Sequence, residues 1–268
     1  GGGIYSNSST VVIENSSIIG NSITNTATND GGAGILSTNN SNIFIRNSSI
    51  LNNNGAVEGS GIKILGGNCF INNSKISNNS AVLNGGGILN EGTLIIDNSF
   101  ITNNQGDYSW SGGGILSRSD LTITNSIIKG NSIGNGGGIF FDANNGDLNI
   151  SNTTIQDNHA YSRGGGICID GASNAIIENS RILSNTSSGS RGGGLYSNVT
   201  SLSLSGSVLA NNFAAGGGGG IYLGYSSPNI LSNFTLYNNN TGSFGGAIYC
   251  QSQANISNVT ILQNSGAN

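Results

Sequence analysis

The sequence predicts an all-β fold, a right-handed parallel β-helix of about ten coils of roughly 27 residues, with three short strands in each coil. Three observations predict it. A Gly-Gly-Gly-Ile motif or a close variant recurs at an almost constant interval, two asparagines follow each copy at fixed distances, and apolar residues alternate with polar ones between them. The aliphatic residues that end the copies are Ile4, Ile35, Ile62, Ile88, Ile115, Ile139, Ile167, Leu195, Ile221 and Ile248.

The runs between the motifs have the two-residue period of β-strands, as in Leu121-Thr122-Ile123. Gly, Asn, Ser and Thr are abundant, and these residues are poor helix formers. We therefore expect one strand starting at each Gly-Gly-Gly-Ile, one ending at the first asparagine, and one between the two asparagines. The usual hand of β crossovers favours the right-handed form.

The second asparagine of the pair is present in every coil. Equivalent residues of neighbouring coils lie about 4.8 Å apart, so each amide can donate a hydrogen bond to one neighbour and accept one from the other. We expect a structural ladder of Asn21, Asn53, Asn79, Asn104, Asn131, Asn158, Asn185, Asn212, Asn239 and Asn264. The first asparagine, such as Asn15 or Asn47, is expected to face inward as well and to cap a bend.

The first glycine of the motif is present in every copy. Its positions are Gly1, Gly32, Gly59, Gly85, Gly112, Gly136, Gly164, Gly192, Gly218 and Gly245. A glycine that is never replaced within one array indicates a corner with positive φ or with no room for a Cβ atom. We expect these glycines and the asparagines to be structural, because one explanation covers all the coils.

The composition describes one elongated domain. The repeat runs through residues 1–268 as a single array, which predicts a rod on the order of 45–50 Å long. Neither end carries a recognisable cap, which indicates a segment of a longer chain or filament. Charged residues make up 7% and the net charge is −4, so a basic surface for nucleic acid is not expected. No run of about 20 apolar residues predicts a membrane span.

The cysteines are too far apart for disulfide bonds. Cys69 lies four coils from Cys168, about 19 Å, and Cys168 lies three coils from Cys250, about 14 Å. Cys69 and Cys250 are expected to point inward and to pack as small apolar side chains.

The repeats resemble those of secreted β-helix surface proteins. Gly245-Gly246-Ala247-Ile248 and Ile-x-x-Asn units such as Ile50 to Asn53 are similar to the Gly-Gly-Ala-Ile and Phe-x-x-Asn repeats of the polymorphic outer-membrane proteins of chlamydiae, and to repeats of adhesin-like proteins of methanogens. Ile or Leu replaces the Phe, and Gly-Gly-Gly replaces most copies of Gly-Gly-Ala. The resemblance implies a secreted or surface-anchored adhesin or stalk.

Some β-helices degrade polysaccharides, a reaction that needs two carboxylates about 5–10 Å apart. Glu14 neighbours Arg46 in register and predicts an exposed ion pair. Asp142 and Asp147 share one loop, which we interpret as a polar turn in preference to a Ca²⁺ site.

The single histidine, His159, has Asp157 beside it and Lys129 one coil below. This trio invites an acid–base function, but a solvated turn is the simpler interpretation. We expect no catalytic residue, no metal site and no cofactor.

The residue after each motif aliphatic is expected to point outward. This row reads Tyr5, Leu36, Lys63, Leu89, Leu116, Phe140, Cys168, Tyr196, Tyr222 and Tyr249. Most of its members are apolar, which predicts an exposed apolar stripe. Tyr196, Tyr222 and Tyr249 should stack about 4.8 Å apart and form a candidate surface for a ligand or partner, with plain stacking between coils as the alternative.

Three functions remain open from the sequence. The first is a non-catalytic structural and adhesive module on the cell surface, which binds other protein subunits or host glycans. The second is a carbohydrate-active β-helix whose active site lies outside this segment or in the longer insertions, Asn21 to Ile35 and Asn104 to Ile115. The third is a subunit of an extracellular filament that associates end to end or laterally.

Overall fold

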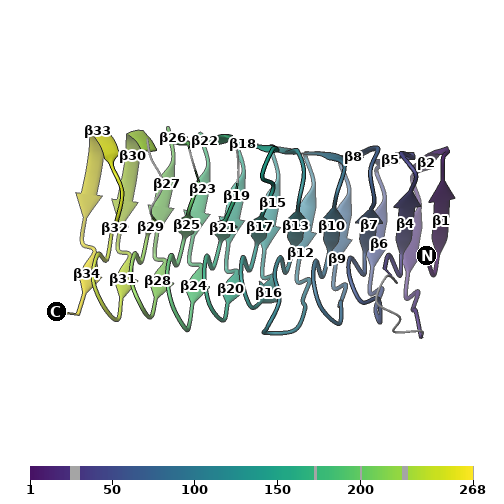
Figure 1. Cartoon of the computed structure of the whole chain (residues 1–268), viewed down its shortest axis with the longest axis horizontal. Coiled ribbons are helices and arrows are strands. Elements are labelled where there is room, and N and C mark those ends of the chain that lie inside the picture. The colour runs from purple at the N-terminus through teal and green to yellow at the C-terminus, as the bar shows by residue number, and fades with distance from the viewer. Residues whose placement is uncertain (25–30, 172–173, 200, 225–228, 268) are drawn as a thin grey trace.

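The computed structural model describes residues 1–24, 31–171, 174–199, 201–224 and 229–267. They form an elongated stack of β coils that runs from β1 near the N-terminus to β34 near the C-terminus (Figure 1). Strands pair in parallel with their equivalents one coil away, as the repeat predicts. The described residues include no helix of the length and hydropathy that a membrane crossing requires.

The first sheet is made by the strands that begin at the glycine motifs. Ile62 is in register with Ile35 on one side and with Ile88 on the other. The ten strands are β1 (Ile4–Asn7), β4 (Ile35–Thr38), β7 (Ile62–Ile64), β10 (Ile88–Asn90), β13 (Ile115–Ser117), β17 (Ile139–Phe141), β21 (Ile167–Ile169), β25 (Leu195–Ser197), β29 (Ile221–Leu223) and β32 (Ile248–Cys250).

The second sheet combines the other two predicted strands of each coil. The strands that end near the first asparagine are β2 (Thr10–Glu14), β5 (Asn42–Arg46), β8 (Asn68–Asn72), β11 (Thr93–Asp97), β14 (Leu121–Thr124), β18 (Asp147–Ser151), β22 (Asn174–Glu178) and β26 (Leu202–Ser205). Those between the asparagines are β3 (Ser17–Ile19), β6 (Ser49–Leu51), β9 (Lys75–Ser77), β12 (Phe100–Thr102), β15 (Ile127–Lys129), β19 (Thr154–Gln156), β23 (Arg181–Leu183) and β27 (Val208–Ala210). In the last two coils β30 (Asn229–Tyr237) and β33 (Ala254–Leu262) span both rows and join them.

A third sheet follows the second asparagine and was not expected from the sequence. Its strands have two residues each, too few to show an alternating pattern. They are β16 (Ser132–Ile133), β20 (His159–Ala160), β24 (Thr186–Ser187), β28 (Phe213–Ala214), β31 (Asn240–Thr241) and β34 (Ser265–Gly266). Single bridges such as Asn54 to Ser80 continue the same row through the earlier coils.

The interior is one continuous column of aliphatic side chains. Ile45, two residues before the first asparagine, and Ile50, three residues after it, are fully buried with Ile35 of the first sheet. Their counterparts in the inner coils belong to the same cluster, whereas Ile256 and Ile261 of the last coil are about half exposed. Each coil is too thin to bury its apolar residues alone, so the stacking of neighbours supplies the hydrophobic stabilisation.

The first asparagine occupies a left-handed corner. φ lies between 46° and 54° at Asn15, Asn47, Asn73, Asn98, Asn125, Asn152, Asn179, Asn233 and Asn258, and Gly206 takes the same place with a φ of 59°. Asparagine and glycine are the residues that adopt this conformation most readily. The predicted bend is confirmed, but the inward orientation was wrong, because the corner turns side chains such as those of Asn15 and Asn47 out to solvent.

A further left-handed corner precedes each ladder asparagine. The residues there are Gly20, Asn52, Asn78, Asn103, Gly130, Asp157, Ser184, Asn211, Asn238 and Gln263, and all have positive φ. Their identity varies more than that of the first asparagine, so the sequence pattern did not reveal the corner.

A column of hydroxyl side chains lies next to the first asparagine. The Ser48 N–H donates to Ser74 Oγ at 3.1 Å, and the Ser74 N–H donates to Ser99 Oγ at 3.1 Å. The column consists of Ser16, Ser48, Ser74, Ser99, Ser126, Thr153, Ser180 and Ser207. Phe234 and Val259 replace the hydroxyl in the two coils where β30 and β33 run without interruption.

Candidate functional site

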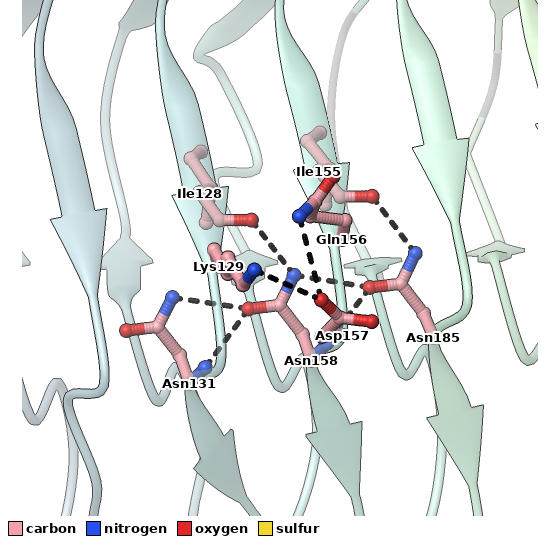
Figure 2. A network of polar contacts seen from close by, with 8 residues as sticks. All are labelled: Ile128, Lys129, Asn131, Ile155, Gln156, Asp157, Asn158 and Asn185. Carbon is pink, nitrogen blue, oxygen red and sulfur yellow. Dashed lines mark hydrogen bonds and ion pairs between the residues drawn. The ribbon is translucent and has the colours of Figure 1, made fainter.

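The asparagine ladder satisfies its amides almost completely (Figure 2). The backbone N–H and the Nδ2 group of Asn158 both donate to Asn185 Oδ1 at 3.0 Å, and Asn158 Nδ2 also donates to the Ile128 carbonyl at 3.0 Å. Asn158 Oδ1 accepts the matching pair of hydrogen bonds from Asn131. The same arrangement links neighbours from Asn21 to Asn264, so the predicted ladder is confirmed.

The last glycine of the motif, which is replaced by Ala247 in the final copy, makes room for the ladder. A Cβ atom on Gly138 would lie 3.1 Å from the side-chain amide of Asn158 and 2.6 Å from the Gly166 carbonyl oxygen. The first glycine serves the corner, since φ at Gly136 is 60°. The first and last glycines of the motif therefore have different structural roles.

The predicted tyrosine stack is present. Ring centroids of Tyr196 and Tyr222 are 5.2 Å apart, and those of Tyr222 and Tyr249 are 4.9 Å apart, with nearly parallel planes. The predicted exposure holds for Tyr5 in the first coil but was wrong for the inner coils, because Tyr196 is 5% and Tyr222 2% exposed, while Tyr249 is half-buried. The buried cluster they join also holds Leu89, Leu116, Phe140 and Cys168.

The residues that precede the glycine motifs cover this row. The positive φ of the first glycine brings the preceding residue alongside the outer face of the first sheet. The guanidinium of Arg163 lies 5.0 Å from the ring centroid of Tyr196, and that of Arg191 lies 5.0 Å from the centroid of Tyr222. Alternation within the strand correctly predicted that the row points away from the core, but it could not predict that Arg163 and Arg191 would lie over these tyrosines.

In the third coil the residue before the glycine motif is Glu58, which forms a buried ion pair with Lys63 of the outward row. Lys63 is 4% exposed, and its Nζ atom lies 3.1 Å from Glu58 Oε2. Burial alone would raise the pKa of Glu58, but hydrogen bonds from Asn84 and Lys63 and the charges of Lys63 and Arg118 hold it below its ordinary value. Arg118 also binds Glu91 at 2.7 Å.

Tyr249 lines a shallow pocket of about 390 Å³. Gly217 stands where the two preceding coils have Arg163 and Arg191, so Tyr249 lacks the arginine cover of its neighbours. Arg191 and the exposed ring of Phe244 form part of the same pocket. Of the three predicted binding tyrosines, Tyr249 is therefore the most accessible.

Several acidic residues are separated along the rod and paired with cations. Arg46 binds Glu14 at 2.7 Å, and both side chains are about half exposed, so the predicted surface pair is confirmed. Lys129 lies 3.4 Å from Asp157.

Asp142 and Asp170 are one coil apart at the end of the first sheet. Burial and the negative charge of Asp170 raise the pKa of Asp142. Asp170 binds Arg163 at 3.0 Å. Asp147 starts β18 on the second sheet, where its backbone N–H donates to Asp120 Oδ1 at 3.0 Å. In the part of the chain that the structure describes, no three His, Cys, Asp or Glu side chains gather closely enough to hold a metal ion.

His159 lies in strand β20 of the third sheet. Its ring nitrogens face hydroxyl groups, with Nε2 at 3.0 Å from Ser188 Oγ and Nδ1 at 3.4 Å from Ser132 Oγ. Burial lowers its pKa. Asp157 turns toward Lys129 in Figure 2, so the Asp-His-Lys trio of the sequence is not joined into one hydrogen-bonded unit.

An aromatic cluster on the loops before the glycine motifs escaped the sequence interpretation. Tyr108, Trp110 and Tyr161 are 67%, 41% and 51% exposed, and the rings of Tyr108 and Tyr161 meet edge to face with centroids 6.3 Å apart. Tyr108 and Tyr161 line a pocket of about 430 Å³. The sequence feature that could have predicted this pocket is a difference in loop length between neighbouring coils. Asn104 and Ile115 are 11 positions apart, whereas Asn131 and Ile139 are 8 apart.

The cysteines are free thiols, as their spacing predicts. Cys69 and Cys168 are buried, and burial raises the pKa of Cys69 to about 12. Cys250 is in register with the buried Leu223, which agrees with the expected inward position, but it is exposed because it lies in the last coil.

A model of the right-handed β-helix region matches residues 3–162 and again residues 137–267. Comparison with curated proteins and with solved structures gives no match. The two matched ranges together cover nearly the whole chain and agree with the parallel coils and the three sheets described above. The chain belongs to the right-handed β-helix family.

Proposed function

We propose that this chain is a non-catalytic structural and adhesive module of a secreted, cell-surface protein. The observation that carries this proposal is the asparagine ladder, which continues from Asn21 to Asn264 without a break. A rod of this kind holds surface groups at fixed distances from whatever anchors it, which is what a stalk or display module requires. The resemblance of the repeats to secreted adhesin-like proteins supports the extracellular location.

The arrangement of charges supports a non-catalytic role. Glu14, Glu91 and Asp157 each bind a cation from a neighbouring coil. Ion pairs at such exposed places stabilise little and leave a smooth polar surface. The partners that fit this surface are other protein subunits or cell-surface glycans, which would be bound through side chains such as the half-buried Tyr249.

A polysaccharide-degrading function is the second candidate, and Asp142 favours it. A carboxyl group with a raised pKa beside a second carboxylate is the pattern of an acid–base pair. Arg118, Asp120 and Asp142 line an open pocket of about 490 Å³. The insertion from Asn104 to Ile115 offers no comparable pair, and residues 25–30 of the first insertion lie outside the described residues.

Binding and cleavage can be compared in one experiment. The protein is incubated with polygalacturonate, xylan and galactomannan, retention on the immobilised polysaccharides is measured, and released reducing ends are counted. We expect retention on a glycan or on glycan-bearing cells without release of reducing ends. Release that disappears in Asp142→Asn would contradict the proposal and establish the enzyme, whereas absence of retention on any glycan, cell or subunit would contradict the adhesive role.

A filament would be seen as concentration-dependent growth in size. Light scattering of the purified chain separates a monomeric rod from one that associates end to end or laterally. We expect a monomer for a display module, and fibres in electron micrographs would favour the filament instead.

A further inference from the structure

We propose that the pocket lined by Tyr108 and Tyr161 binds a neutral saccharide, with this contacting pair of tyrosines as its aromatic side. This inference rests on the adhesive function proposed above and assigns it a site that the tyrosine stack does not include. The pocket has a volume of about 430 Å³, which is within the range of small-ligand sites.

Unequal loops create the pocket. The loop before Gly112 is long, and the loop of the following coil, around Gly134, is short. Tyr108 of the long loop therefore reaches across the short loop and contacts Tyr161, which lies in the loop beyond it. A Cβ atom on Gly134 would collide with the carbonyl oxygens of Tyr108 and Trp110, which shows how closely the long loop lies on it. The Asn135 N–H fastens the loop by donating to the Trp110 carbonyl at 2.8 Å.

Tyr161 is held from its own side. The His159 ring meets it edge to face with centroids 4.6 Å apart, and His159 Nε2 lies 3.0 Å from Ser188 Oγ. The Tyr161 backbone N–H donates to the Ile133 carbonyl at 2.9 Å. Backbone hydrogen bonds therefore hold Tyr161 itself and the loop that carries Tyr108, and little ordering would be needed when a ligand enters.

The lining has the two properties that a sugar ring requires. The C–H face of a pyranose packs against exposed aromatic rings, here those of Tyr108 and Tyr161. Its hydroxyl groups need donors and acceptors at the rim, and Gln105, Asp107 and Ser132 supply an amide, a carboxylate and a hydroxyl group.

The charge of the lining selects a neutral sugar. Asp107 is the charged residue among those that line the pocket, and it would repel a uronic or sialic acid. One Asp107 oxygen accepts the Ser109 N–H at 2.9 Å, so the carboxylate is held in the loop turn. Burial lowers the pKa of the neighbouring His159, which disfavours a positive charge on its ring.

The surroundings favour a small ligand over a protein partner. The nearby apolar exposure is limited to Val82, Trp110 and the two tyrosine rings, whereas a stable protein interface needs about 800 Å² on each side. A single sugar unit or a short oligosaccharide fits a pocket of about 430 Å³ better.

Saturation-transfer NMR with methyl glucoside, methyl galactoside and methyl mannoside tests the site directly, and dextran and galactomannan extend the test by affinity electrophoresis. We expect transfer to at least one neutral sugar, and a loss of affinity of about tenfold or more in Tyr108→Ala and in Tyr161→Ala. Tyr5→Ala is the matched control, because Tyr5 is 58% exposed in the first coil and far from the pocket. Unchanged thermal unfolding of Tyr108→Ala confirms that its effect is local.

Two results would overturn the saccharide site. One is that none of the neutral sugars or polysaccharides binds, and the other is that binding persists in both tyrosine variants. If the wild-type chain still adheres to glycans or cells in either case, the adhesive function survives and its site lies elsewhere. Adhesion that depends on Tyr108 but withstands enzymatic removal of the cell's glycans would indicate a protein ligand and would also overturn the saccharide.

Discussion

Asn158 Oδ1 accepts two hydrogen bonds from Asn131, one from the backbone N–H and one from the side-chain amide, both at 3.0 Å. One oxygen atom thus fixes both the backbone and the side chain of the neighbouring coil. Because Asn158 makes the same two bonds to Asn185, the position of each coil is tied to the next along the rod.

Replacing one ladder asparagine should weaken the rod strongly. In Asn158→Ala, two Asn131 donors lose their buried acceptor and the Ile128 carbonyl loses its donor. We expect the free energy of unfolding to fall by about 3–5 kcal/mol, measured by urea denaturation.

The matched control is Asn152→Gly, at the exposed left-handed corner of the same coil. Gly206 already occupies this corner in another coil. We expect a change below about 1 kcal/mol, because glycine adopts positive φ without strain. Equal losses in the two variants would contradict the different roles of the two asparagine columns.

Glycine substitutions separate backbone strain from lack of space. Gly20 and Gly136 have similar φ values of 68° and 60°, but a Cβ atom on Gly20 meets nothing within 4 Å, whereas one on Gly136 would lie 2.7 Å from Phe140 Cα. Gly20→Ala should cost about 1–2 kcal/mol. Gly136→Ala should cost about 1–3 kcal/mol more. Equal urea midpoints of the two variants would contradict this prediction and show that the corner at Gly136 can accommodate a Cβ atom.

Two ion pairs of different burial should respond differently to loss of the acid. In Glu58→Gln the buried Lys63 ammonium loses its partner, and we expect a loss of about 3 kcal/mol in thermal or urea unfolding. Glu14→Gln breaks the exposed pair with Arg46 and should cost less than about 1 kcal/mol. The idea of a buried pair fails if the Glu58 variant is as stable as the Glu14 variant.

The pKa of His159 predicts the sign of a pH effect. Burial lowers this pKa in the folded state below 6.5, so the unfolded chain binds the proton more readily. The contribution of His159 is complete above pH 6.5 and is lost progressively as the pH falls below it. We expect the urea midpoint of the wild type to decrease more than that of His159→Gln between about pH 7.5 and pH 5.5. If the urea midpoints of the wild type and of His159→Gln decrease equally, the pKa of His159 is the same in the folded and unfolded states and the prediction is wrong.

The sequence predicted the repeating parts of this structure because a fixed position in every coil meets the same neighbours. The ladder from Asn21 to Asn264 and the positive φ of glycines such as Gly136 follow from this periodicity. The hydroxyl column that begins at Ser16 is also periodic, with Phe234 and Val259 as its exceptions, but serine is so abundant in the chain that this periodicity did not stand out.

The unpredicted parts depend on contacts between loops of different length. Tyr196 and Tyr222 were expected on the surface because strand alternation turns them outward, yet Arg163 and Arg191 return over them from the preceding coils. The pocket beside Tyr108 likewise exists because one loop is longer than the next. Loop lengths can be counted in the sequence, but the direction in which a loop folds depends on packing.

Side-chain amide hydrogen exchange tests the ladder most directly. In an asparagine-labelled sample, single substitutions assign the NH₂ signals of Asn131, Asn158 and Asn185, and of the corner residues Asn125 and Asn152. We predict that the three ladder amides exchange at least about a hundredfold more slowly than the two corner amides, because they open only when neighbouring coils separate. Similar exchange rates in the two groups would contradict a buried file of asparagines and the β-helix built on it.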